Sequence, residues 1–130
     1  MTRSSAKMEL NWKKLCMMAS AEIESTLSKL PKPLCNQAKN LPVTFERKPN
    51  LDLLADGIES DTLGLFVGPE FADEEHVPMP PQIILFLENL WDVAGGDEDV
   101  FSKEVRVTFL HELGHYLGLE EDDLTERGLE

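Results

Sequence analysis

The segment "FLHELGHYLG", Phe109 to Gly118, places two histidines four residues apart, with a glutamate directly after the first. On an α-helix, residues i and i+4 differ by about 40° around the axis and about 6 Å along it, so His111 and His115 point the same way. Two imidazoles can then bind one metal ion. The segment therefore predicts a helix that carries two ligands of a metal site.

The residues before and after this segment predict a long helix over Asp99–Leu117. It has acids near its start and no glycine or proline except Gly114, and Gly118 suits a left-handed cap. Apolar residues throughout it predict a largely buried helix: Val105, Val107, Phe109, Leu110, Leu113 and Leu117. We expect His111 and His115 to be buried side by side, where they need partners.

A second helix is predicted near the N-terminus. Over Asn11–Leu30 the apolar residues recur at spacings of three and four, which is typical of an amphipathic helix. Pro31 and Pro33 end this helix, and a short helical turn is expected over Leu34–Ala38.

Three strands are expected between the two long helices. Leu41–Lys48 has β-branched, alternating character, and Thr62–Gly68 has similar features. Gln82–Trp91 opens with a continuous apolar run, typical of a central strand covered on both faces. Residues 48–61 suit a loop with one helical turn, and the acidic, proline-rich residues 69–81 suit an irregular surface loop.

This order of elements predicts an α+β fold. A small mixed three-stranded sheet would pack against an N-terminal helix and a C-terminal active-site helix. The length of 130 residues suits one domain, so we expect a single domain over residues 1–130 with a flexible N-terminus over residues 1–10.

Composition restricts the classes of partner. The chain has 25 acidic and 12 basic residues and a formal net charge of -13, which disfavours nucleic acid. No apolar run suits a secretory signal or a membrane span, so we expect a soluble, cytoplasmic protein without a membrane partner. Cys16 and Cys35 are expected to be reduced, partly buried thiols.

The chemistry of the motif favours zinc. A catalytic zinc ion takes three protein ligands and leaves one position for water, and the helix offers His111 and His115. Glu112 is turned about 100° from His111, where its carboxylate can act as general base on a metal-activated water. The sequence therefore predicts a zinc-dependent peptidase with one Zn²⁺ per chain and a peptide or protein substrate.

The third metal ligand is not decided by chemistry alone. After Gly118 the chain can turn back toward the metal, and the next polar residues are all carboxylates: Glu120, Glu121, Asp122 and Asp123. Reach favours Glu121 and Asp122. A later glutamate, Glu126 or Glu130, is the less favoured alternative.

The segments "VTFLHELGHYLGLEEDDL", "LGLFVG" and "IILFLENL" together resemble the small zincin-like metallopeptidases of bacteria. The resemblance covers most of the chain after Leu41 and implies a minimal zincin-like domain. The family's pattern, H-E-x-x-H-x-x-G-x-x-D, implies Glu121 as the third ligand. The family usually has Asp there, and Asp122 could replace Glu121 by a shift of one residue.

The resemblance also implies a substrate-binding strand. In zincin-like folds an edge strand above the metal pairs with an extended peptide, and here that strand would be Thr62–Gly68. Gly64, Leu65 and Phe66 are its candidate substrate-binding residues, and Gly64 would allow a close backbone approach.

Other polar and aromatic residues are interpreted without a role in the site. Tyr116 points about 100° away from His115 and is expected to pack in the interior. Trp12 and Trp91 are expected in or near the core. His76 lies in the acidic loop and is expected to be solvated.

Two other functions stay open at this point. One is a metal-dependent endoribonuclease-like hydrolase, whose pattern uses a third histidine and nearby basic residues. After His115 the chain has no further histidine, and residues 116–126 contain no lysine or arginine. The other is a non-catalytic zinc-binding interaction module, which would need a fourth ligand and no base such as Glu112.

Overall fold

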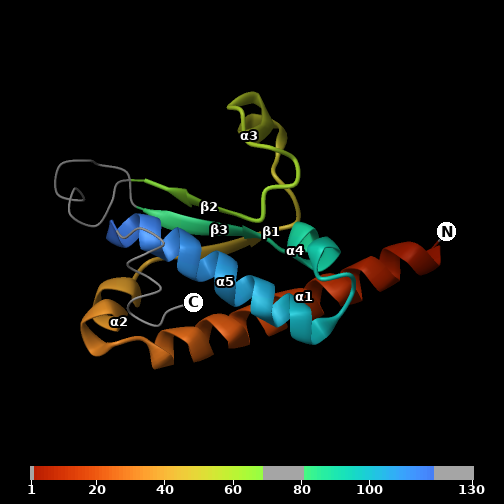
Figure 1. The fold of residues 1–130 in the computed structure, drawn as a ribbon. Coiled ribbons are helices and arrows are strands. Elements are labelled where there is room, and N and C mark those ends of the chain that lie inside the picture. Colours follow the sequence, from red (N-terminus) through yellow and green to blue (C-terminus); the bar gives the residue numbers. More distant parts are fainter. Residues whose placement is uncertain (1, 69–80, 119–130) are drawn as a thin grey trace.

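The structure, a computed structural model, describes residues 2–68 and 81–118. Two long helices, three short helices and a three-stranded mixed sheet form an α+β fold, as predicted (Figure 1). The elements are α1 (Thr2–Lys29), α2 (Lys32–Ala38), β1 (Val43–Glu46), α3 (Leu51–Ala55), β2 (Gly64–Val67), β3 (Gln82–Phe86), α4 (Leu87–Val93) and α5 (Glu98–Leu117).

The sheet has the strand order β1-β3-β2, so β3 is the central strand, as predicted. β1 runs parallel to β3, with Val43 opposite Ile83. β2 runs antiparallel to β3, with Gly64 opposite Leu85. Among the described residues β2 is therefore an edge strand of the sheet, in line with the sequence-based expectation for this segment.

Helix α5 lies at the centre of the packing. It contacts β2 and β3 on one side and α1 on the other, so that it is enclosed between the sheet and α1 (Figure 1). Burial of each large apolar side chain contributes about 1.5–3 kcal/mol. The core side chains that are essentially inaccessible to solvent are Phe86, Phe101, Phe109, Ile83, Leu85, Leu87, Leu90, Leu113 and Val105.

The ends of α5 are fixed by local signals in the sequence. The Asp97 carboxylate accepts a hydrogen bond from the Val100 N–H at 3.0 Å, which satisfies a free donor of the first turn. Gly118 has φ of 70° and its N–H donates to the His115 carbonyl at 3.2 Å. The predicted helix and its glycine cap are thus confirmed.

The predicted strand Gln82–Trp91 is wrong in its second half. The strand ends at Phe86, and α4 begins at Leu87 without an intervening loop. Leu87 and Leu90 are both buried at a helical spacing of three. The apolar run crosses the boundary between the two elements, so its continuity hid the change from strand to helix.

The other boundaries differ by smaller amounts. Helix α1 begins at Thr2 rather than at Asn11. The expectation of a single domain with a flexible N-terminus stays a prediction. The helical turn expected before β1 is α2, with proline in its first turn, and the one expected in residues 48–61 is α3. Within the described residues, no helix combines the length and apolar character that a membrane span needs.

The segment that leads into β2 is held by a buried side chain of α4. The Asn89 amide donates hydrogen bonds to the carbonyls of Ser60 at 2.8 Å and Thr62 at 2.9 Å. The N–H of Phe86 donates to the Leu63 carbonyl at 3.0 Å. These bonds fix the position of the segment that leads into β2, and thereby the position of β2 relative to α5.

Gly64 lies at a point of close approach between β2 and α5. A Cβ atom added to Gly64 would lie 2.6 Å from Thr108 Cγ2 and 3.1 Å from Leu85 Cδ2. Atoms of these types do not approach so closely, so the glycine is required by the packing. The neighbouring groups are side chains of α5 and β3, whereas the close approach of another backbone that the sequence suggested for Gly64 stays a prediction.

We predict that Gly64→Ala lowers the free energy of unfolding by about 1–3 kcal/mol, because the added methyl group overpacks the contact with Thr108. Urea denaturation followed by circular dichroism measures the change. Thr108→Ser removes the clashing Cγ2 atom, so the double variant should recover part of the loss. Equal losses in the single and double variants would contradict this account of Gly64.

Candidate metal centre

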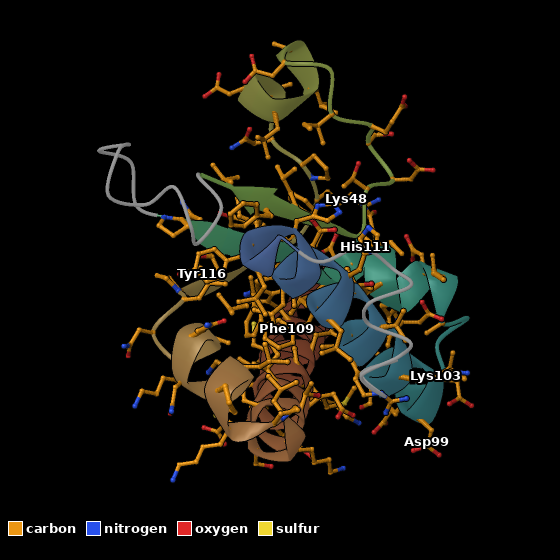
Figure 2. All side chains as sticks on the ribbon, turned by 60° about the vertical axis from the view of Figure 1, so that its left-hand side comes forward. Lys48, Asp99, Lys103, Phe109, His111 and Tyr116 are labelled. Carbon is orange, nitrogen blue, oxygen red and sulfur yellow. The ribbon has the colours of Figure 1, made fainter. Side chains whose placement is uncertain are left out.

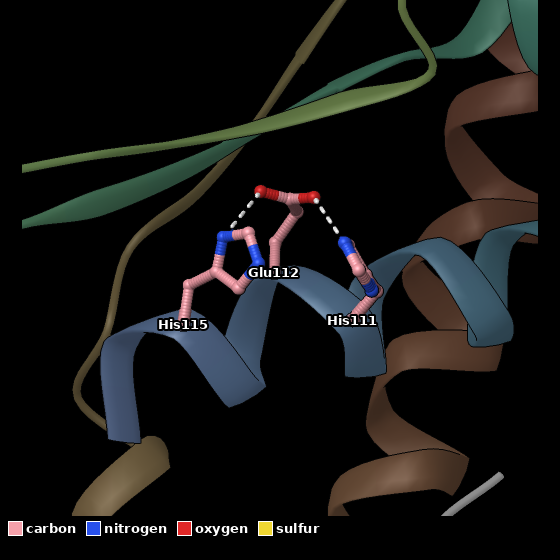
Figure 3. A group of neighbouring side chains, drawn as sticks. All are labelled: His111, Glu112 and His115. Atoms are coloured by element: carbon pink, nitrogen blue, oxygen red, sulfur yellow. Dashed lines mark ion pairs between the residues drawn. The ribbon is translucent and has the colours of Figure 1, made fainter. Parts of the chain in front are cut away.

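The last two turns of α5 carry His111, Glu112 and His115. One potential ligand atom from each residue lies within 4.8 Å of the other two. The His111 and His115 ring centroids are 4.7 Å apart. Figure 3 shows the two imidazoles on either side of the Glu112 carboxylate, which rises from the helix toward the strands. The helix thus brings together the three residues that the sequence singled out.

The exposure of the two histidines differs from the sequence-based expectation. The side chains of His111 and His115 are 42% and 53% exposed, whereas that of Glu112 is only 10% exposed. The buried apolar residues of α5 face α1 and the sheet, as Phe109 does in Figure 2, and the histidines occupy another side of the helix. The expectation that both histidines are buried is therefore wrong, and they are accessible from solvent.

Glu112 is held by the edge strand. Its Oε1 atom accepts a hydrogen bond from the Phe66 N–H at 3.0 Å. The same atom lies 3.7 Å from His115 Nδ1, and Oε2 lies 3.9 Å from His111 Nε2. This carboxylate therefore has a fixed position between both imidazoles and the backbone of β2.

Burial raises the pKa of Glu112 above its ordinary value. The neighbouring His115 and His111 and the hydrogen bond from Phe66 act in the opposite direction, but desolvation is the largest effect. A carboxylate that is costly to keep ionised takes up a proton more readily than one in water. This property suits a group that accepts a proton during a reaction near neutral pH.

The donor set fits a zinc ion. Zinc prefers imidazole nitrogens at about 2.0–2.1 Å, which places two tetrahedral ligands about 3.4 Å apart. The potential ligand atoms of this cluster lie within 4.8 Å of one another, so the imidazoles need to move closer together, and half-exposed imidazoles can rotate into position. The two histidines on one turn of helix thus supply nitrogen ligands, and their exposed side leaves room for further groups.

A pocket of about 320 Å³ opens beside the histidine nearest the helix start. Its walls come from the beginning of β2 and from α5, and its lining residues are Leu63, Gly64, Glu104, Val107, Thr108, His111 and Glu112. Val107, which the sequence suggested was buried, is 43% exposed and lines this pocket. A substrate group in the pocket would therefore lie against both His111 and Glu112.

Glu104 and Thr108, two pocket residues of α5, were not predicted as part of the site, although a signal was present. Glu104, Thr108, His111 and His115 follow one another at intervals of four, three and four. Such residues lie within about 60° of one another around a helix. The stripe that carries the histidines thus continues toward the start of α5.

The edge of β2 exposes the backbone of alternate residues. The Phe86 N–H donates to the Leu63 carbonyl, so in an antiparallel pair the polar backbone groups of Leu65 also face β3. Those of Gly64 and Phe66 point away from β3, consistent with the bond from Phe66 to Glu112. Of the three candidate substrate-binding residues, Leu65 is therefore not placed to pair its backbone with a further strand.

The remaining sequence-based expectations concern packing and thiols. Tyr116 is buried, and its ring lies 5.7 Å from the Phe66 ring, as expected for a packing residue. Trp12 and Trp91 are partly buried against the core. Cys16 and Cys35 are free thiols of intermediate exposure. Glu121, Asp122 and His76, by contrast, lie outside the described residues.

A helix with this histidine–glutamate–histidine cluster, packed beneath the edge strand of a small sheet, has the form of a metallopeptidase centre. The model of the zincin-like metallopeptidase family matches residues 38–129, and the chain therefore belongs to that family. The match begins after α1 and covers β1 through α5. No curated protein matches the chain.

We predict that Glu112→Gln stabilises the metal-free protein at neutral and alkaline pH. The folded-state pKa of Glu112 is raised, so this group contributes stability below its unfolded pKa and loses that contribution as the pH rises through the folded pKa. Gln does not titrate. The melting temperatures of the two proteins, measured after removal of metal with EDTA, should diverge as the pH rises from 4 to 8. A constant difference across this range would contradict the effect of desolvation on Glu112.

Proposed function

We propose that the chain is a zinc-dependent peptidase, in which His111 and His115 bind zinc and Glu112 is the general base. Membership of the zincin-like metallopeptidase family supports the class of reaction. The observation that carries the proposal is the position of Glu112, whose carboxylate lies between both imidazoles and under the substrate-facing edge of β2.

Zinc bound to the two histidines would supply a Lewis acid that polarises the peptide carbonyl and makes water more acidic. The residues of the chain would supply the rest. Glu112 would accept a proton from the attacking water and pass it to the leaving amine. Its hydrogen bond to Phe66 leaves Oε2 as the oxygen that faces His111 and the pocket, which supports a role in proton transfer.

The edge of β2 would orient the substrate. An extended peptide that pairs with the outward-facing backbone of Gly64 and Phe66 would run alongside the cluster. The Phe66 N–H already bonds to Glu112, so the carbonyls of both residues and the Gly64 N–H are the groups left for a peptide. This geometry supports an extended segment of peptide or protein as the substrate.

The third zinc ligand would come from the chain after Gly118. Gly118 ends α5 in a left-handed conformation, which would let the following residues turn back toward the metal and so supports a ligand a few residues later. We propose Glu121 for this role, with Asp122 as the alternative, so that the site would have two nitrogen ligands and one oxygen ligand.

The alternative functions have less support. A ribonuclease-like hydrolase needs basic residues to approach phosphates, but the described residues that line the pocket include two glutamates, Glu104 and Glu112, and no lysine or arginine. A structural zinc site would leave the buried Glu112 without a function, although a carboxylate in that position carries a desolvation cost. Both observations favour the peptidase.

We predict that the protein purified without a tag or chelator contains about one zinc per chain, and that Glu112→Gln keeps the zinc but loses at least about 100-fold of peptidase activity. His115→Ala should lose both, because it removes a ligand. Elemental analysis and a fluorogenic peptide assay measure the two properties.

Asp99→Asn is a suitable control for these variants, because Asp99 is exposed at the far end of the same helix (Figure 2). It should keep zinc and activity. Absence of divalent metal from the wild-type protein, or full activity in Glu112→Gln, would contradict the proposed function.

We predict that Glu121→Ala weakens zinc binding about 10- to 100-fold, as expected for loss of one of three ligands, whereas Asp122→Ala leaves it nearly unchanged. Competition with a chromogenic chelator measures both affinities. The opposite result would assign the third ligand to Asp122. Two unchanged affinities would place the ligand elsewhere.

A further inference from the structure

The geometry points to Glu104 as the residue that selects the substrate: its carboxylate would bind a lysine or arginine side chain in the pocket beside the metal centre. This inference rests on the proposed function, because it assigns a substrate class to that same site. It concerns the pocket between the start of β2 and α5, about 320 Å³ in volume.

The position of Glu104 on α5 brings it near the metal centre. It lies seven residues before His111, on the same stripe of α5 and about 10 Å away along the axis. Both residues line the one pocket. A side chain that enters the pocket next to His111 can therefore extend along the helix toward Glu104.

The pocket wall also has apolar residues. Besides His111 and Glu112 of the metal centre, the pocket is lined by Leu63, Val107, the methyl-bearing Thr108 and Glu104. Because Glu112 belongs to the metal centre, Glu104 is the carboxylate left for a substrate side chain. An apolar wall with such a carboxylate suits an amphipathic cation, since lysine and arginine pack an aliphatic stem against apolar surface and keep the charged group at its end. A leucine side chain would contact the apolar wall without reaching Glu104, and the Glu104 carboxylate would repel a glutamate side chain.

The Glu104 carboxylate is available to bind a substrate side chain. Within residues 2–68 and 81–118, its carboxylate makes no ion pair and no hydrogen bond. By comparison, Glu98 on the same helix pairs with Lys14 at 2.7 Å, and Glu88 pairs with Arg47 at 2.7 Å. Glu104 is partly buried at the pocket, so a cation there would meet a carboxylate with little competition from the protein.

The separation of Glu104 and His111 along the helix, about 10 Å, also suits a long side chain. An extended peptide advances about 3.3 Å per residue, so the helix distance between His111 and Glu104 corresponds to about three residues of a substrate that runs along β2. A residue next to the scissile bond reaches that distance only with a long side chain. Lysine and arginine have both the length and the charge.

The test measures binding separately from catalysis. Zinc-loaded protein is titrated calorimetrically with short peptide hydroxamates that differ only in one lysyl, leucyl or glutamyl side chain. The lysyl compound should bind about tenfold more tightly than the leucyl compound, as expected for a charge-assisted hydrogen bond. Glu104→Gln should remove this preference, and Glu104→Lys should shift it to the glutamyl compound.

Two controls separate this effect from general loss of charge or structure. Asp99→Asn removes one negative charge from the same helix outside the pocket and should keep the preference. All variants should keep the zinc content of the wild type. A lysyl preference that survives Glu104→Gln, or no preference in the wild type, would overturn the inference.

Cleavage of a fluorogenic peptide library by the same proteins completes the test. Glu104→Gln should raise KM about tenfold for peptides with lysine or arginine beside the cleaved bond and leave leucine peptides unchanged. A lysyl preference in binding without any cleavage would overturn the peptidase function and leave the role of Glu104 in place. Cleavage that does not depend on Glu104 would support the peptidase function and overturn the role of Glu104. Failure of all hydroxamates to bind would overturn the peptidase function and the role of Glu104 together.

Discussion

The hydrogen bond from the Phe66 N–H to Glu112 joins the two parts of the molecule on which the site depends. It links the edge strand of the sheet to the helix that carries the histidines, at a distance of 3.0 Å between donor and acceptor. Without it, a carboxylate that is only 10% exposed would have to find another donor or move toward solvent. The close contact of Gly64 with α5 and the hold of Asn89 on the preceding segment both serve to bring the strand within reach. The backbone of β2 thus acts as a structural partner of Glu112 as well as a surface for an extended peptide.

The parts of this arrangement that depend on local sequence could be predicted. The relative positions of His111 and His115 follow from helix geometry, and the ends of α5 follow from Asp97 and Gly118. The central position of the strand that begins at Gln82 follows from its apolar run. Each of these features involves residues that are close in the chain, where the covalent structure itself limits the possible arrangements.

The parts that depend on contacts between distant residues could not be predicted. Phe66 and Glu112 are 46 positions apart in the chain, and no sequence pattern in either segment predicts their hydrogen bond. The end of β3 at Phe86 was hidden because Leu87 continues the apolar run while it already belongs to a helix. The exposure of the histidines depends on which sides of α5 the sheet and α1 cover. Apolar residues occur on several sides of that helix, so composition alone did not identify the open one.

Helix α1 precedes the region that matches the family, yet it covers the side of α5 opposite the sheet. Its buried side chains Leu15, Ala19 and Ile23 belong to the same core as Phe101 and Val105 of α5. The part of the chain that matches the family therefore has an apolar surface on α5, and α1, which lies outside the matched residues, covers that surface. The residues of the metal centre and the residues of α1 that cover the core thus lie in different parts of the chain. Substitutions in α1 can therefore change how long the protein stays folded without altering the metal centre.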